Sequence, residues 1–230
     1  MIFELVAPSG AGKTYSVKKL STHFEYQTHF TKVLTRETMK VDSKHAFIAL
    51  VYRIKLIVFC IFLYPARFLQ IVKLIHRTNK TFKNSKKIDK FILSYVMFYN
   101  LAAVFQMRGR DCCFLLDQGP FQVLTSYAIR CLDVEVDLKP IVSVFIETLP
   151  SDYYVVSLDY TINKIQKNLA LRNSPQDAHR YRIYYESNEK INQTFQIFRC
   201  LLKLLSENNK VIRDTAHQNL SWQRLMKDFK

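Results

Sequence analysis

The stretch that decides the fold lies near the N-terminus and reads Ile2-Phe3-Glu4-Leu5-Val6-Ala7-Pro8-Ser9-Gly10-Ala11-Gly12-Lys13-Thr14. The apolar run Ile2–Val6 predicts a buried β-strand, and a helix is expected over about 13–28. Between them, the spacing of small residues, Gly, Lys and Thr matches a phosphate-binding loop (P-loop), with Ala7 where Gly is usual. Strand, loop and helix together predict that the chain binds a nucleoside triphosphate, ATP.

Each residue type in this loop has a physical reason to be there. Small residues let backbone N–H groups curl around phosphate oxygens, next to the positive end of the helix dipole. The ATP-binding residues expected from the loop are Pro8, Ser9, Gly10, Ala11, Gly12, Lys13 and Thr14. Lys13 supplies a positive charge to the β- and γ-phosphates, and the Thr14 hydroxyl is suited to ligate Mg²⁺.

Strands and helices are expected to alternate along the rest of the chain, which predicts an α/β domain with a parallel sheet of about five strands. The further strands are expected at Lys32–Leu34, Cys112–Leu116, Tyr153–Leu158 and Val211-Ile212. Helices are expected over 45–76 with a break at Pro65, from Ile88 to about Ala103, and over 120–132, 137–148, 162–171, 183–207 and 219–229, with residues 78–87 as a loop.

Residues 44–110 form an expected helical insertion that is apolar and basic. The chain has a net charge of +15, and residues 40–90 hold 12 Lys/Arg but only Asp42 and Asp89 as acids. The uncharged run Leu56–Ala66 is too short to span a bilayer. Three interpretations remain: the insertion lies on an anionic membrane surface, it covers the acceptor site or forms a homodimer interface, or it binds nucleic acid. No specific nucleic acid is expected, because no recognised nucleic-acid module is present.

Two features suggest where the protein works. The five cysteines show no metal-ligand spacing and are expected to be reduced. Met1 leads directly into the first strand, so no secretory signal is expected. The phosphate-binding site is therefore expected to face the cytoplasm, with the insertion placing the protein at the inner face of the membrane in the lipid-binding interpretation.

Asp117 directly follows the apolar run Cys112–Leu116 and begins Asp117-Gln118-Gly119-Pro120. A carboxylate at the end of this strand is suited to hold Mg²⁺, directly or through water, or to accept a proton from the phosphoryl acceptor. The alternative is that Asp117 only caps the following helix.

Two polar loops carry the remaining candidates. The Arg-rich loop 172–182, with Arg172, Arg180 and Arg182, predicts a lid that neutralises charge on a transferred phosphoryl group; the alternative is a solvated surface loop. Arg36 and Glu37 follow the second strand and face the ligand side of the sheet. Arg36 is suited to grip an anionic acceptor and Glu37 to bind its hydroxyl or a metal-bound water, unless the two form a plain surface pair.

The order of these motifs resembles the thymidylate kinase branch of the P-loop nucleoside and nucleotide kinases. Apart from the insertion, the resemblance runs nearly end to end through the P-loop, Val33–Glu37, Leu116–Gln118, Asp152–Tyr160, Leu171-Arg172 and Val211–Asp214. It implies a single P-loop kinase-type domain of three layers over residues 1–230. It also implies that Arg172 and the loop Arg213–His217, with Ala216, flank the adenine, and that Arg180 or Arg182 reaches the phosphates.

Two departures from the family pattern fall on the acceptor side. The family usually has Asp-Arg where this chain has Asp117-Gln118, which places Gln118 at the acceptor, and the loop after Arg36-Glu37 lacks the family's Pro-Gly. We therefore expect an ATP-dependent kinase that transfers the γ-phosphoryl group to an acceptor other than dTMP, such as a membrane-linked glycan or lipid carrier. The alternatives are a thymidylate or nucleoside kinase and, in another class, a membrane-associated regulatory ATPase or switch.

Overall fold

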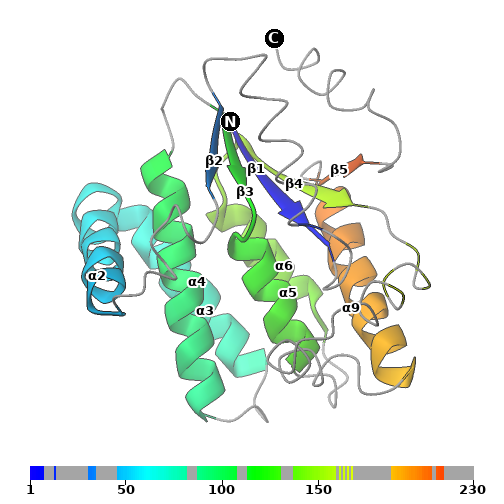
Figure 1. The fold of residues 1–230 in the computed structure, drawn as a ribbon. Coiled ribbons are helices and arrows are strands. Elements are labelled where there is room, and N and C mark those ends of the chain that lie inside the picture. The colour runs from blue at the N-terminus through cyan, green and yellow to red at the C-terminus, as the bar shows by residue number, and fades with distance from the viewer. Residues whose placement is uncertain are drawn as a thin grey trace.

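The computed structural model contains one five-stranded sheet in which every pairing is parallel (Figure 1). It describes residues 1–7, 13, 31–34, 46–81, 87–107, 113–130, 137–158, 161, 163, 165, 167, 188–208 and 211–214. The strand order is β2-β3-β1-β4-β5. The strands are β1 (Ile2–Val6), β2 (Thr31–Leu34), β3 (Cys113–Leu116), β4 (Tyr153–Leu158) and β5 (Val211–Asp214). The predicted α/β class with a parallel sheet is confirmed.

Strand β1 occupies the middle of the sheet, with Ile2 level with Phe114 of β3 and with Tyr153 of β4. All five of its residues are buried. A strand that is buried on both faces has a continuous run of apolar residues, whereas a half-exposed strand alternates apolar and polar residues. This explains the pattern of Ile2–Val6. Glu4 is the exception in this run, and it is fully buried.

The described helices lie to one side of the strands in Figure 1. Helices α4, α5 and α9 pack side by side, with α5 against β1 and α9 against β5, while α3 packs on α6 and α2 lies outermost, on α3 and α4. The helices are α2 (Ala46–Leu63), α3 (Pro65–Thr81), α4 (Lys87–Met107), α5 (Pro120–Arg130), α6 (Lys139–Thr148) and α9 (Asn188–Ser206). The break at Pro65 agrees with the prediction.

The insertion shares one hydrophobic core with the sheet. Leu56 of α2, Ile71 of α3 and Phe105 of α4 belong to the same buried cluster as Ile2 and Phe121. Residues 44–110 thus contribute core-forming helices to the same body. Cys60 in this core and Cys200 on α9 are free thiols, the first buried and the second exposed.

Taken singly, none of the described helices has the length and apolar character needed to cross a membrane. The segments Ile54–Leu63 and Pro65–Lys80 meet these criteria only as a pair, and the pair is bent by 120°.

Two predicted loops are wrong in their described parts, where regular structure continues further. Helix α3 continues to Thr81, although the polar residues 78–87 predict a loop, because Thr78 is buried and Asn79 Nδ2 donates to Ser94 Oγ on α4. Lys87 begins α4, and residues 82–86 and 215–217 lie outside the described residues. Strand β5 includes Arg213 and Asp214, the first of which opened the predicted loop 213–217, because they pair with Ser157 and Leu158 of β4.

The other predicted helices fall partly outside the described residues. Within the predicted helix 162–171, the described residues 163, 165 and 167 are helical. The first helix beyond Lys13, residues 183–187 and the predicted helix 219–229 lie outside the described residues.

Candidate functional site

The order of the strands marks one place in the sheet where a ligand is expected. From β1 the chain connects to β2, which lies two positions away on one side of the sheet. From β3 the chain crosses β1 and connects to β4, which lies on the other side. Two neighbouring strands whose connections run in opposite directions form a topological switch point, and ligands of open parallel sheets bind outside the carboxyl ends of such strands. Lys13 follows β1 and Asp117 follows β3, so both belong to this edge.

Lys13 and Asp117 form an ion pair there. The Nζ atom of Lys13 lies 3.8 Å from Oδ1 of Asp117, and both side chains are largely buried. Lys13 also donates a hydrogen bond of 3.3 Å to Oε1 of Gln122, in the first turn of α5. Asp117 Oδ1 is buried and receives no hydrogen bond from the described residues, since 3.8 Å is beyond hydrogen-bonding distance. The site therefore holds a buried cation beside a carboxylate oxygen with spare acceptor capacity.

Glu4 lies beneath this pair and binds the start of α5. Its Oε1 accepts hydrogen bonds from the backbone N–H of Gly119 at 3.0 Å and of Gln122 at 2.7 Å. Its Oε2 accepts one from the N–H of Phe121 at 2.9 Å and another from the Tyr153 hydroxyl. Pro120 has no N–H, so one carboxylate satisfies every backbone donor from Gly119 to Gln122. A negative group at a helix N-terminus is also favoured by the helix dipole.

Gly119 is needed at its position because Glu4 fills the space beside it. A Cβ atom at Gly119 would lie 2.6 Å from both Cδ and Oε2 of Glu4. The carboxyl group has no easy way to retreat, since it is fully buried and held by four donors. Gly119 therefore allows β1 and the turn after β3 to approach closely, which fixes Asp117 opposite Lys13.

The electrostatics of the cluster follow from its burial. Burial raises the pKa of Glu4 above its ordinary value of 4.5, and this is offset in part by the Tyr153 hydrogen bond, the N–H groups of Gln122 and Phe121, and the charge of Lys13. Burial, together with the charge and hydrogen bond of Glu4, raises the pKa of Tyr153 well above 10. Tyr153 thus remains protonated and donates to Glu4 across the physiological pH range.

We expect Glu4 to make the free energy of unfolding depend on pH. Because its pKa is higher in the folded state than in the unfolded state, the folded protein binds more protons between pH 4.5 and the raised pKa. The contribution of Glu4 to stability is therefore fully present below pH 4.5 and is lost as the pH rises through the raised value. Urea denaturation at several pH values should show this decline in the wild type and a flatter profile in Glu4→Gln. Parallel profiles for the two proteins would contradict the assignment.

The predicted site residues divide into those the structure describes and those it does not. It brings Lys13 and Asp117 together, and Gln118 lies half-buried beside Asp117. Arg213 is described only as a strand residue of β5, paired with Ser157. The remaining predictions lie outside the described residues: Pro8, Ser9, Gly10, Ala11, Gly12, Thr14, Arg36, Glu37, Arg172, Arg180, Arg182 and Ala216.

Sequence reasoning missed Glu4, Gln122 and Tyr153. Glu4 did carry a signal, because an acid inside a buried apolar strand needs hydrogen-bond partners. Gln122 carried none, since a single polar residue in the first turn of a helix is common.

The charged residues described do not form a metal centre by themselves. Among them, no group of three or more His, Cys, Asp and Glu residues is placed to hold a metal ion. Mg²⁺ bound to a nucleotide needs only one or two carboxylates, because phosphate oxygens and water supply its other ligands. The buried Oδ1 of Asp117, which accepts no hydrogen bond from the part of the chain that the structure describes, is suited to that single contact.

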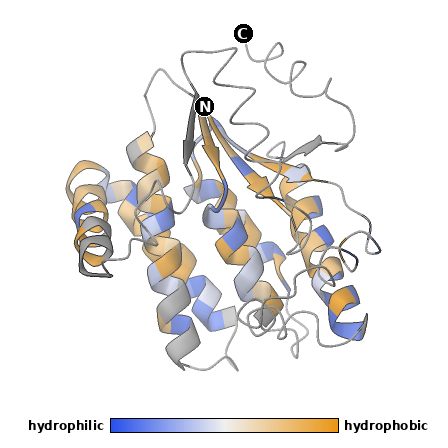
Figure 2. Cartoon of the chain, in the orientation of Figure 1, coloured by the Kyte–Doolittle hydropathy of each residue, from blue (hydrophilic) through white to orange (hydrophobic). Residues whose placement is uncertain are grey.

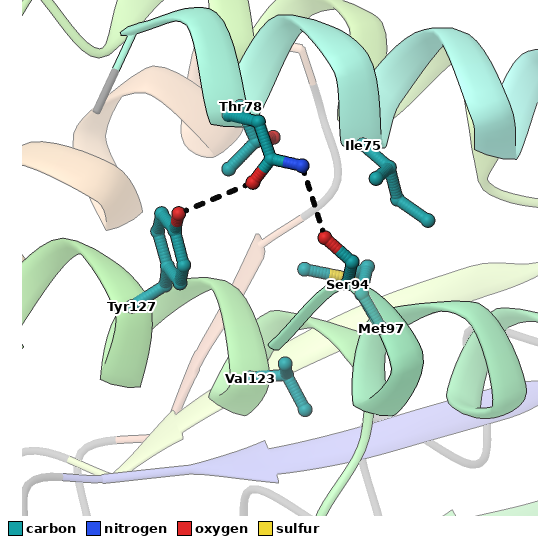
Figure 3. Close-up of a pocket in the computed structure, with 7 residues that line it drawn as sticks. Ile75, Thr78, Ser94, Met97, Val123 and Tyr127 are labelled. Carbon is teal, nitrogen blue, oxygen red and sulfur yellow. Dashed lines mark hydrogen bonds between the residues drawn. The ribbon is translucent and has the colours of Figure 1, made fainter. Parts of the chain in front are cut away.

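A second polar cluster joins the insertion to α5, as shown in Figure 3. Asn79 Nδ2 donates to Ser94 Oγ at 3.1 Å, and the Tyr127 hydroxyl donates to Asn79 Oδ1 at 3.3 Å. The cavity between them, also lined by Ile75 and Val123, has a volume of about 10 Å³. That is room for about one water molecule, so this cavity is a packing feature and not a substrate pocket.

No protein-family model matches the chain, and no curated protein matches it at a significant level.

Proposed function

We propose that this chain is an ATP-dependent phosphotransferase of the thymidylate kinase-like type, built on a three-layer P-loop kinase domain with a helical insertion. One observation carries the proposal: Lys13 of the P-loop sequence lies 3.8 Å from Asp117, at the switch point between β1 and β3. A Lys that serves the β- and γ-phosphates and a carboxylate that serves the metal or the acceptor must both reach the transferred group. Their proximity supports a common site for ATP and acceptor.

Among the described residues, Lys13 and Asp117 are assigned roles in phosphoryl transfer. Lys13 exchanges its contacts with Asp117 and Gln122 for oxygens of the β- and γ-phosphates, where its charge stabilises the transition state. The new bond joins the acceptor oxygen to the γ-phosphorus while the bond to the ADP oxygen breaks. Asp117 either takes the proton of the acceptor hydroxyl or holds Mg²⁺, which neutralises charge on the phosphates.

The acceptor is proposed to differ from dTMP because Gln118 replaces the expected Arg. A neutral amide cannot form the bidentate, charge-assisted pair with a phosphate that a guanidinium forms. A membrane-linked glycan or lipid carrier is the proposed class. Transfer of labelled γ-phosphate to dTMP, deoxynucleosides, free sugars, lipid-linked glycans and lipid carriers should give product only with the last two classes. Efficient phosphorylation of dTMP would favour a thymidylate kinase, and hydrolysis without any acceptor product would favour a regulatory ATPase.

We expect Asp117→Asn to impair phosphoryl transfer far more than nucleotide binding. The amide keeps the size of the carboxylate but loses its charge and basicity, so transfer should fall by roughly 10²-fold. Removing a negative charge near the phosphates should leave ATP affinity within about tenfold of the wild type. Single-turnover transfer and fluorescent ATP-analogue binding measure the two effects. The matched control is Asp137→Asn, an exposed site, and equal losses of binding and transfer in Asp117→Asn would refute the assigned role.

A further inference from the structure

Helix α2 exposes an apolar stripe along its outer face. The exposed large side chains recur at intervals of three or four residues, so they lie on one side of the helix. They are Leu50, Val51, Ile54, Val58, Ile61 and Phe62, followed by Leu63 at the helix end. Phe62 is 77% exposed, although Leu56 and Cys60 on the opposite side are buried in the core. Figure 2 shows this outermost helix as predominantly hydrophobic where it is coloured. A contiguous stripe of this kind on the surface of a protein marks an interaction site.

Helix α3 continues the stripe and then changes character. Its exposed face is apolar near the break, with Leu69 65% exposed and Val72 also exposed. Further along, the same face carries Lys73, His76, Arg77 and Lys80, all of them exposed. Ile71 and Leu74 anchor the inner face in the core. The exposed surface thus passes from apolar at the corner to basic at the far end of α3.

The corner between the two helices is held firmly by the body of the protein. The pair is bent by 120° at Tyr64, whose ring lies 5.9 Å from that of Phe59 and 6.2 Å from that of Phe105. Arg67 lies over the Phe105 ring, with its guanidinium carbon 5.8 Å from the ring centroid, and donates to the backbone oxygen of Glu147 on α6. A corner fixed in this way presents Phe62, Leu63 and Leu69 outward without first having to be ordered.

The charge of this segment is of one sign. Residues 46–81 contain six Lys/Arg (Arg53, Lys55, Arg67, Lys73, Arg77 and Lys80) and no Asp or Glu. Lys73 has an acidic neighbour, Glu147 of α6, with Nζ 3.9 Å from Oε2, but both side chains are largely exposed. This one carboxylate offsets one of the six positive charges, so the segment stays positive.

We propose that the α2–α3 corner is a membrane-docking element that inserts its apolar stripe among the lipids of an anionic bilayer, with its basic residues at the headgroups. Helices with an apolar face edged by Lys and Arg bind in this way. A second copy of the chain fits the same face poorly. A symmetric dimer would bring these cations toward their own counterparts, and residues 46–81 offer no acid to neutralise them. The inference is independent of the phosphoryl transfer proposed above.

Vesicle flotation of the full-length chain tests the proposal. The wild type should float with vesicles of phosphatidylcholine containing phosphatidylglycerol, and much less with phosphatidylcholine alone. The double substitution Phe62→Ser and Leu69→Ser should lower the bound fraction to near background. Removing one basic charge, as in Arg77→Gln, should weaken binding to the anionic vesicles by about fivefold at low salt, since each such charge contributes about 1 kcal/mol.

Phe91→Ser provides the matched control. Phe91 is 73% exposed but belongs to the first turns of α4, away from the α2–α3 corner, so its loss should leave flotation unchanged. Circular dichroism and gel filtration of each variant establish that it is folded and report its oligomeric state. Absence of wild-type flotation on anionic vesicles would overturn the proposal, as would an equal loss in Phe91→Ser. A wild-type dimer that becomes monomeric in the double variant, without flotation, would assign the surface to a second copy instead.

Discussion

Lys13→Ala should reduce phosphoryl transfer from ATP by roughly 10²–10³-fold or more, which is the largest effect on activity that we expect. The physical reason is that the Lys13 ammonium is the buried cation of the candidate site and lies beside Asp117 and Gln122. A preorganised positive group in a site sheltered from water stabilises transition-state charge far more than one in bulk water. The measurement is single-turnover transfer of labelled γ-phosphate at saturating ATP.

The control for this experiment is Lys139→Ala, which removes an exposed Lys from the first turn of α6 and should leave the rate unchanged. Because Lys13 also compensates buried negative charge, the thermal stability of Lys13→Ala is measured in parallel. A folded Lys13→Ala protein with near-normal transfer would exclude the P-loop assignment on which the proposed function depends.

Glu4→Ala should lower the free energy of unfolding by about 3–5 kcal/mol, the largest effect on stability that we expect. The substitution leaves the N–H groups of Gly119, Phe121 and Gln122 and the Tyr153 hydroxyl buried without their acceptor. Each orphaned donor costs about 1–3 kcal/mol, partly offset because a buried charge is also removed. Domains are stable by only about 5–15 kcal/mol, so this is a large share of the total.

Thermal denaturation followed by circular dichroism should show the Glu4→Ala midpoint lowered by roughly 6–20 °C, at about 2–4 °C per kcal/mol for a chain of this size. Glu147→Ala is the control, because it also truncates a glutamate, but one that is exposed and whose carboxylate pairs with the exposed Lys73. Its stability should stay within about 0.5 kcal/mol of the wild type. If the two variants melt together, Glu4 does not hold the start of α5.

Much of the fold follows from local patterns. The apolar run Tyr153–Leu158 predicted β4 with its exact bounds, and Pro65 predicted the break between α2 and α3. Patterns of this kind report which residues are buried and where a backbone N–H is missing, both of which are properties of short segments. The same logic failed at Thr78 and Asn79, whose polar side chains suggest a loop, because Thr78 is buried and Asn79 donates a hydrogen bond to Ser94 on α4.

In the cluster of Lys13, Asp117, Gln122, Glu4 and Tyr153, the sequence predicted Lys13 and Asp117 as site residues. Lys13 is identified by its P-loop spacing and Asp117 by its position after an apolar run. Neither signal states that the two side chains meet, since their separation depends on which strand lies next to β1. Glu4 carries a signal as a single acid within five buried strand residues, but that signal does not name its partners, which lie more than 100 residues away in the chain.

By itself, then, the stretch Ile2–Thr14 determined a buried strand followed by a loop suited to phosphate, because composition and spacing are local properties. Only the tertiary structure decided what surrounds Lys13. It placed the Glu4 carboxylate on the N–H of Gly119, 115 residues away in the chain, and so set Asp117 opposite Lys13. It also decided which apolar residues of α2 enter the core and which face outward, since apolar residues occur around the whole helix and its sequence does not distinguish them. Contacts across such distances arise from packing, which no local pattern records.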